Sequence, residues 1–177
     1  MKFASLTLAL ASVAVLTGCT NLVSLNPFVT AKQAVLDPNL SGTWKSSDGD
    51  SLFVVQQNSS SYSITYTDGK GTSLKLTGLV FRAGDAELLD LVSENEAFLQ
   101  VPVHAVVRVW PEGSLLRWTF LDSKWLREQV GKRLVSQPNG EGQLLTAPGD
   151  TVRSVLLEHA ADSKAFENAP DVLTRVP

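Results

Sequence analysis

The sequence predicts a mainly β fold, built as an antiparallel up-and-down meander or barrel of about seven to eight strands with C-terminal helices. Three observations support this prediction. Short segments alternate apolar and polar residues, turn-forming residues recur about every ten residues, and helical periodicity occurs only late in the chain. The alternative is an α+β fold, in which an open curved sheet carries the helices on one face.

The central part of the chain supplies the expected strands. Residues 62–67 alternate large apolar side chains with hydroxyl residues, which is typical of a half-buried strand. Further strands are expected at 52–56, 73–81, 87–92, 101–110 and 115–121. Between them lie Asp68-Gly69, Gly84-Asp85 and Pro111-Glu112-Gly113, and these residue types favour the tight turns that join antiparallel neighbours.

Two later segments predict helices. Asp122 is expected to cap the segment 123–130, and Gly131 follows as a stop. After Asp150, residues 151–160 show helical periodicity. The apolar face of this second helix comprises Val152, Val155, Leu156 and His159. Both helices are expected to close against the sheet.

The N-terminal residues have the composition of an export signal. Lys2 is followed by the apolar residues 3–16, which span roughly 21 Å as a helix and so fall short of the roughly 30 Å hydrocarbon core of a bilayer. A basic start, a short apolar core and small residues before Cys19 are typical of a secretory signal peptide. Cys19 is the only cysteine, so no disulfide can form within the chain.

Leu16-Thr17-Gly18-Cys19 resembles the lipobox of bacterial lipoproteins. The resemblance implies that the sulfur of Cys19 receives a diacylglyceryl group, that a peptidase cuts before Cys19, and that a fatty acid such as palmitate acylates the new amino terminus. Two or more acyl chains hold a protein firmly on a membrane. In such lipoproteins an aspartate after the cysteine favours the inner membrane. Thr20 stands there instead, which implies the outer membrane and a domain that faces the periplasm.

These features divide the chain into three parts. Residues 1–18 are expected to be the signal peptide, residues 19–40 a lipidated N-terminus and tether, and residues 41–177 a single β-rich domain with C-terminal helices. Residues 28–36 of the tether could instead form a short helix that docks on the domain. Cleavage removes Lys2 and takes the formal net charge from −3 to −4. An acidic chain offers no electrostatic footprint for nucleic acid, so we exclude that partner.

Gly42-Thr43-Trp44 resembles the Gly-x-Trp that opens the first strand of lipocalins and their relatives. In that family the tryptophan closes one end of a barrel, and an arginine packs on it. Arg117, Arg127 and Arg133 are candidates for this arginine. The resemblance implies a lipocalin-like barrel that carries a small apolar or anionic ligand.

The sequence contains no motif for catalysis, metal binding or cofactor binding. His104 and His159 are the only histidines and lack metal-ligand spacing, and neither a nucleophile elbow nor a glycine-rich phosphate loop occurs. We therefore expect no cofactor, no metal and no enzymatic activity. The alternative is a hydrolase that uses His104, and it requires an acid within about 3 Å of the imidazole.

One face of the expected strand 101–110 carries polar side chains. His104 and Arg108 share this face, opposite an aliphatic face that we expect in the core. Arg117 on the following strand is expected to approach Arg108 and form a cationic spot for a carboxylate or phosphate. Asp90 and two nearby glutamates are expected to be solvated charges.

A stripe of large apolar residues lies on the expected strand 115–121. Trp118 aligns with Leu116 and Phe120, and this stripe lines either a packed interior or an apolar pocket. The candidate ligand contacts are thus Trp44, His104, Arg108, Arg117 and Trp118.

The predicted function is that of a membrane-anchored extracytoplasmic lipoprotein without enzymatic activity. Its partners would be the lipid bilayer, through acylated Cys19, and another cell-envelope component that binds the β domain. The carrier of a small apolar or anionic ligand is a second possibility, and the hydrolase is a third.

Overall fold

The computed structural model describes residues 22–47, 52–57, 60–94, 101–122, 125, 126, 128, 134–139, 142–160, 162–166 and 170–176. The predicted signal peptide 1–18 and Cys19 lie outside the described residues. Eleven strands, one longer helix and two short 3-10 helices form the described fold. In chain order they are β1 (Leu22–Ser24), η1 (Pro38–Leu40), β2 (Gly42–Ser46), β3 (Leu52–Gln57), β4 (Tyr62–Thr67), β5 (Ser73–Ala83), β6 (Ala86–Ser93), β7 (His104–Glu112), β8 (Leu115–Phe120), β9 (Ser136–Asn139), β10 (Gly142–Leu145), α2 (Gly149–His159), η2 (Ser163–Ala165) and β11 (Asp171–Val176).

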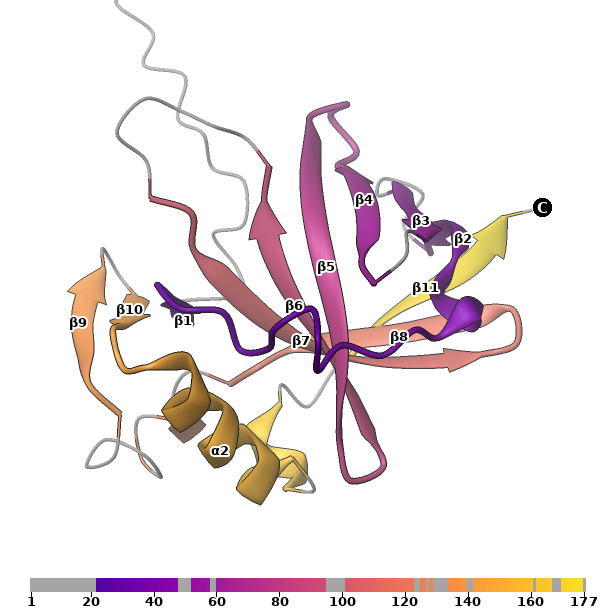
Figure 1. Cartoon of the computed structure of the whole chain (residues 1–177). Coiled ribbons are helices and arrows are strands. Elements are labelled where there is room, and N and C mark those ends of the chain that lie inside the picture. The colour runs from indigo at the N-terminus through magenta and orange to yellow at the C-terminus, as the bar shows by residue number, and fades with distance from the viewer. Residues whose placement is uncertain are drawn as a thin grey trace, which may run out of the picture.

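Eight of these strands pair in a complete antiparallel circuit. Each strand from β2 to β8 pairs with the next, and β11 pairs with both β8 and β2. Gly84 and Gly113 stand in the turns after β5 and β7 with φ of 60° and 63°, a conformation that suits glycine. The mainly β fold with a meander and a C-terminal helix is confirmed (Figure 1).

Three further strands extend the sheet from β7. His104 pairs with Val92 of β6 on one edge of β7 and with Ser24 of β1 on the other, the edge that β8 occupies from Val107 onward. β10 runs parallel to β1, and β9 pairs antiparallel with β10. The sheet is therefore mixed and branched at β7, rather than a simple antiparallel barrel (Figure 1).

Two apolar clusters lie on the two faces of the circuit. The first, which we call the inner cluster, takes at least one side chain from each of the eight strands. Its buried members are Leu40, Trp44, Val55, Tyr62, Ile64, Val80, Leu89, Leu91, Val107, Val109, Leu116 and Leu173. Alternation along the strands explains this convergence, because every second side chain of a strand points to the same face.

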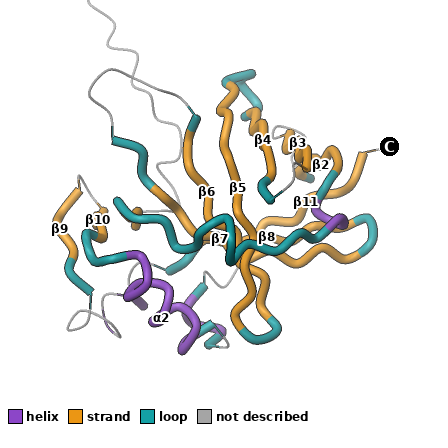
Figure 2. Tube along the Cα trace, in the orientation of Figure 1, coloured by secondary structure: helices purple, strands orange, loops and turns teal. Residues whose placement is uncertain are grey.

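The second cluster, the helix cluster, lies between the outer face of β5–β7 and α2 (Figure 2). The apolar face predicted for residues 151–160 is buried there through Val152, Val155 and Leu156. Trp125 and Leu126 belong to the same cluster. The carboxylate of Asp122 accepts a hydrogen bond of 2.6 Å from the Trp125 backbone N–H, which is the predicted cap.

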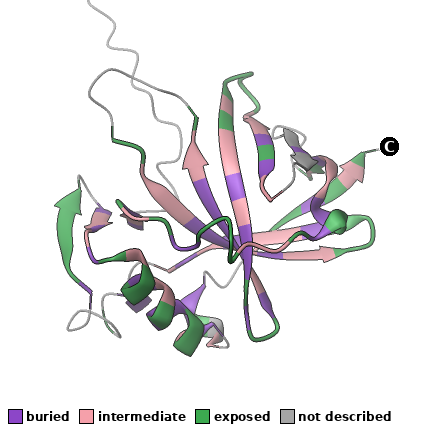
Figure 3. Cartoon of the chain, viewed as in Figure 1, coloured by how far each residue is buried: buried purple, intermediate pink, exposed green. Residues whose placement is uncertain are grey.

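The tether predicted for residues 19–40 is wrong for residues 22–40, because these residues are part of the fold. Phe28 and Val29 are buried in the helix cluster, and Leu40 is buried in the inner cluster. Figure 3 shows buried stretches along the segment that joins β1 to β2. The Val35 N–H donates to the Val80 carbonyl over 2.8 Å. Burial of each such side chain stabilises the folded state by about 1.5–3 kcal/mol, which offsets the entropy of a free tether.

Candidate functional site

Trp44 and Arg175 close one end of the eight-strand circuit. The Trp44 ring is fully buried, and its Nε1 donates to the Leu40 carbonyl over 3.0 Å. The Arg175 guanidinium lies 4.2 Å from the centroid of this ring and donates to the carbonyls of Ser41 and Asn39 over 2.8 and 2.6 Å. The arginine on Trp44 is therefore Arg175. It was not one of the three arginines suggested by the sequence, of which Arg127 and Arg133 lie outside the described residues. Trp44 itself is a core residue.

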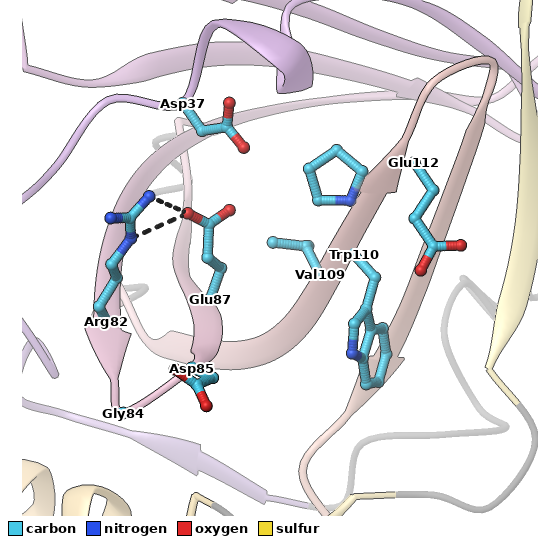
Figure 4. Close-up of a pocket in the computed structure, with 9 residues that line it drawn as sticks. Asp37, Arg82, Gly84, Asp85, Glu87, Val109, Trp110 and Glu112 are labelled. Carbon is cyan, nitrogen blue, oxygen red and sulfur yellow. Dashed lines mark hydrogen bonds and ion pairs between the residues drawn. The ribbon is translucent and has the colours of Figure 1, made fainter.

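An open pocket of about 400 Å³ lies beside this end (Figure 4). The segment before η1, the β5–β6 hairpin and the end of β7 form its walls. Its lining residues are Asp37, Arg82, Gly84, Asp85, Glu87, Val109, Trp110, Pro111 and Glu112. Of its four carboxyl groups, Glu87 is paired with Arg82 and Glu112 with Arg117, so two negative charges remain in excess and favour a cationic group. We call it the acidic pocket.

Asp37 is buried and Glu87 is half-buried in the acidic pocket, and Figure 4 shows their carboxyl groups on the same side of it. Arg82 donates to one Glu87 oxygen from Nε and Nη2 over 3.1 and 2.8 Å. The pKa of Glu87 is nevertheless raised, because burial, and after it the neighbouring Asp37 carboxyl, outweigh the opposing effect of Arg82. Two carboxyl groups at such close quarters favour the uptake of a proton or a cation.

Asp37 is held in place from two sides. One carboxylate oxygen accepts from the Asn39 N–H over 2.9 Å at the start of η1, and the Asp37 carbonyl accepts from the Tyr62 hydroxyl over 2.9 Å. Burial raises the pKa of the Tyr62 hydroxyl. The acid is thus fixed to the rim of the inner cluster, and its position does not depend on a ligand.

His104 forms a pair with Asp90 on the outer face of β6 and β7. Nδ1 of His104 lies 2.9 Å from one Asp90 oxygen, and the other oxygen accepts from the Phe28 N–H over 3.0 Å. The side chain of Asp90 is only 2% exposed. The expectation that Asp90 is a solvated charge is therefore wrong, because the N-terminal segment covers this face of β6.

This His104–Asp90 pair meets the distance that the hydrolase alternative required. Both oxygens of Asp90, however, are engaged by groups that connect three segments of the chain: β6, β7 and residues 25–36. A buried carboxylate that joins a main-chain N–H to an imidazole is well placed to fix the N-terminal segment on the sheet.

Arg108 and Arg117 meet at the indole ring of Trp110. Their guanidinium carbons lie 4.5 and 5.8 Å from the ring centroid, and Arg108 also lies 5.7 Å from the centroid of Phe166. Burial lowers the pKa of Arg108. Arg117 is paired with Glu112 of the acidic pocket. The predicted approach of the two arginines is present, but Glu112 offsets one of the two charges.

The stripe of Leu116, Trp118 and Phe120 packs against the inner cluster. Leu116 is buried, and the Trp118 ring lies 5.4 Å from Phe120 and 6.5 Å from Tyr66, measured between centroids. Neither the acidic pocket nor a smaller one of about 180 Å³ beside Gly149 is lined by this stripe. Trp118 and Phe120 keep partial exposure, so an aromatic edge remains open to solvent.

No three His, Cys, Asp or Glu side chains among the described residues gather closely enough to hold a metal ion. Within the same residues no helix has the length and apolar character needed to cross a bilayer. Comparison of the chain with protein-family models, curated sequences and solved structures gave no match.

The acidic pocket was not found from the sequence. Its acids stand at positions 37, 85, 87 and 112. The pairing of β5, β6 and β7 and the contact of Val35 with Val80 bring them together. One signal was available, because Glu87 opens the apolar strand Glu87–Val92 on the face of Leu89 and Leu91. An acid in register with core residues indicates a charge at the margin of the core.

Proposed function

We propose that this chain is a non-enzymatic lipoprotein of the cell envelope, anchored in the outer membrane by acylated Cys19, whose β domain binds another envelope component. The acidic pocket is the binding site, and its occupant is a basic group of the partner, such as a lysine or arginine side chain. The observation that carries the proposal is the excess of carboxyl groups in an open cavity of about 400 Å³.

The composition of the acidic pocket favours such an occupant. Asp37 is buried, and its carboxyl raises the pKa of the half-buried Glu87, so a cation near both acids relieves the repulsion between them. Trp110 adds an aromatic wall, although two arginines already contact its ring. The lipobox supplies the anchor, and the domain needs no spanning segment to stay on its membrane.

A pull-down from detergent-solubilised envelopes tests the proposal with four proteins. The intact chain is compared with Cys19→Ser, with the pocket variant Asp85→Asn/Glu87→Gln, and with Asp150→Asn/Glu158→Gln as a control that removes the same charge from α2. We expect one partner to be retained by the intact chain, by Cys19→Ser and by the control, and to be lost by the pocket variant.

Other outcomes contradict the proposal in distinct ways. A partner that is lost with Cys19→Ser alone is merely located on the same membrane. Retention by the pocket variant places binding elsewhere on the domain. The mass of the N-terminal peptide shows directly whether Cys19 carries acyl groups. An unmodified Cys19 would contradict the proposal that the chain is a lipoprotein.

One observation favours a second candidate, the carrier of a small apolar or anionic ligand. The aromatic edge of Tyr66, Trp118 and Phe120 is half-buried at the inner cluster, and the Trp44–Arg175 contact matches what the lipocalin resemblance implies. The test is a titration with anilinonaphthalene sulfonate, a dye that is both apolar and anionic. A carrier gives saturable emission that Trp118→Ala abolishes and Leu115→Ala, a solvent-exposed change on the same strand, preserves.

A further inference from the structure

The described fold begins very close to the proposed lipid anchor. β1 starts at Leu22, and Thr20 and Asn21 are the only residues between it and Cys19. β1 is an integral part of the sheet, because it lies between β7 and β10 and its residues Leu22 and Ser24 are buried. There is no room for a spacer between the membrane and the domain.

The covalent chain limits the distance between Leu22 and the lipid. Three steps of 3.8 Å separate the Cα atoms of Cys19 and Leu22, so these two atoms are at most about 11 Å apart. Each headgroup layer is roughly 5–8 Å thick. Because the acyl chains of Cys19 must enter the hydrocarbon, its Cα atom lies at the headgroup layer, and Leu22 is held within about 11 Å of that atom.

The strands next to Leu22 are suited to this position. Leu22 pairs with Gln143 of β10, which pairs with Pro138 of β9. All four residues of β9 are exposed, and neither β9 nor β10 contains a charged residue. Among the described strands, none covers the outer edge of β9. Uncharged polar groups and free main-chain groups can contact headgroups without losing the hydration of a charge.

We propose that the corner formed by β1, β10 and β9 lies directly on the headgroup layer of the bilayer that holds Cys19. We call it the membrane-facing corner. The proposal rests on the acylation of Cys19 in the proposed function. Contact of the membrane-facing corner with the headgroups fixes the orientation of the domain relative to the bilayer.

This orientation leaves the acidic pocket accessible. The pocket is lined by Val109–Glu112, which lie five to eight residues along β7 from His104, the partner of Ser24. At strand rise this separation is roughly 16–26 Å. A partner therefore reaches the acidic pocket without displacing the membrane-facing corner.

The test uses single cysteines, because an acylated Cys19 leaves no free thiol in the chain. Gln137→Cys places a fluorescent label on β9, and Ser114→Cys places the same label in the β7–β8 turn, far from β9 in Figure 1. Each acylated protein is inserted into vesicles of phosphatidylethanolamine and phosphatidylglycerol that contain a lipid with a nitroxide on its headgroup. We expect quenching at residue 137 to exceed that at residue 114 by at least about twofold.

A second variant tests whether the short link between Cys19 and β1 causes the difference in quenching. Twelve glycine and serine residues inserted between Asn21 and Leu22 add a flexible reach of roughly 19 Å, so the difference between the two labels should disappear. Equal quenching at both positions in acylated protein, or an unchanged difference after the insertion, overturns this inference. Missing acyl groups in the mass spectrum of the same protein overturn the proposed function itself, so the two failures are distinguishable.

Discussion

Arg175 stacks on Trp44, and this contact joins the last strand of the circuit to the first. The guanidinium carbon lies 4.2 Å from the ring centroid, and the same guanidinium donates to the carbonyls of Ser41 and Asn39. One side chain on β11 therefore holds both the Trp44 ring and the segment that enters β2. This contact adds to the main-chain pairing of β11 with β2, which closes the circuit.

We expect Arg175→Ala to lower the free energy of unfolding by about 1.5–3 kcal/mol, because it removes a cation–π contact and two charge-assisted hydrogen bonds. Urea denaturation followed by tryptophan fluorescence measures this change. Lys45→Ala, an exposed cation on the neighbouring strand β2, is the control and should stay within about 0.5 kcal/mol of the unchanged protein. Equal midpoints for both variants would show that Trp44 is held without Arg175.

Gly149 allows the start of α2 to contact the N-terminal segment. A Cβ atom at this position would lie 2.3 Å from the Pro27 carbonyl oxygen, which is main chain and cannot rotate away. We expect Gly149→Ala to cost about 1–3 kcal/mol through this overpacking. Thermal unfolding followed by circular dichroism measures the cost. Ser154→Ala on the exposed face of α2 is the control, and a similar melting temperature for both variants would contradict the prediction.

Asp90 is expected to fix the N-terminal segment rather than to serve chemistry. In Asp90→Asn, one of the two acceptors for the Phe28 N–H and His104 is replaced by a donor, at a cost of about 1–3 kcal/mol. We expect faster hydrogen exchange at the Phe28 amide and earlier proteolysis between residues 25 and 36. Glu94→Gln, an exposed acid near the end of β6, should change neither. If the Phe28 amide stays protected from exchange in Asp90→Asn, the structural role is wrong and the His104–Asp90 pair remains a candidate for catalysis.

Local patterns predicted those parts of the fold that are formed by local contacts. Alternation and turn residues predicted the hairpins from β3 to β8, and the spacing of Val152, Val155 and Leu156 predicted α2. The strands β1 and β11 were missed because they pair with distant segments, and β1 is also short, with three residues. β11 pairs with β2 across more than a hundred residues, and a single sequence carries no local sign of such a pairing.

The absence of local signs for long-range contacts also explains which residues of the candidate site were predicted and which were missed. Arg108 and Arg117 were expected to meet because their strands are consecutive, and they do contact the same ring. Arg175 and Asp37 were missed because their partners come from non-neighbouring segments. Asp90 was placed in solvent because the covering segment, residues 25–36, was assigned to a tether. Whether a charge on a strand is buried depends on what packs on that face of the sheet. The sequence of the strand itself does not show which distant segment covers it.

Glu87 supplies the last prediction, a dependence of stability on pH. Its pKa in the folded protein is raised above the ordinary value of 4.5, through burial and the Asp37 carboxyl, against the pull of Arg82. Between 4.5 and the raised pKa, the folded state therefore binds more protons than the unfolded state. Stability must fall as the pH rises through this window, and the loss persists above it.

We expect Glu87→Gln to remove this fall. The variant should be at least as stable as the unchanged protein at pH 7, and its urea midpoint should vary less between pH 4.5 and 7. Arg82→Gln removes the opposing cation, raises the pKa of Glu87 further and should extend the fall to higher pH. Tyr62, with a raised pKa, and Asp162, with a lowered one, titrate outside this range and do not disturb the comparison. Parallel profiles for all three proteins would mean that solvent reaches Glu87 freely and that the acidic pocket holds no strained carboxyl pair.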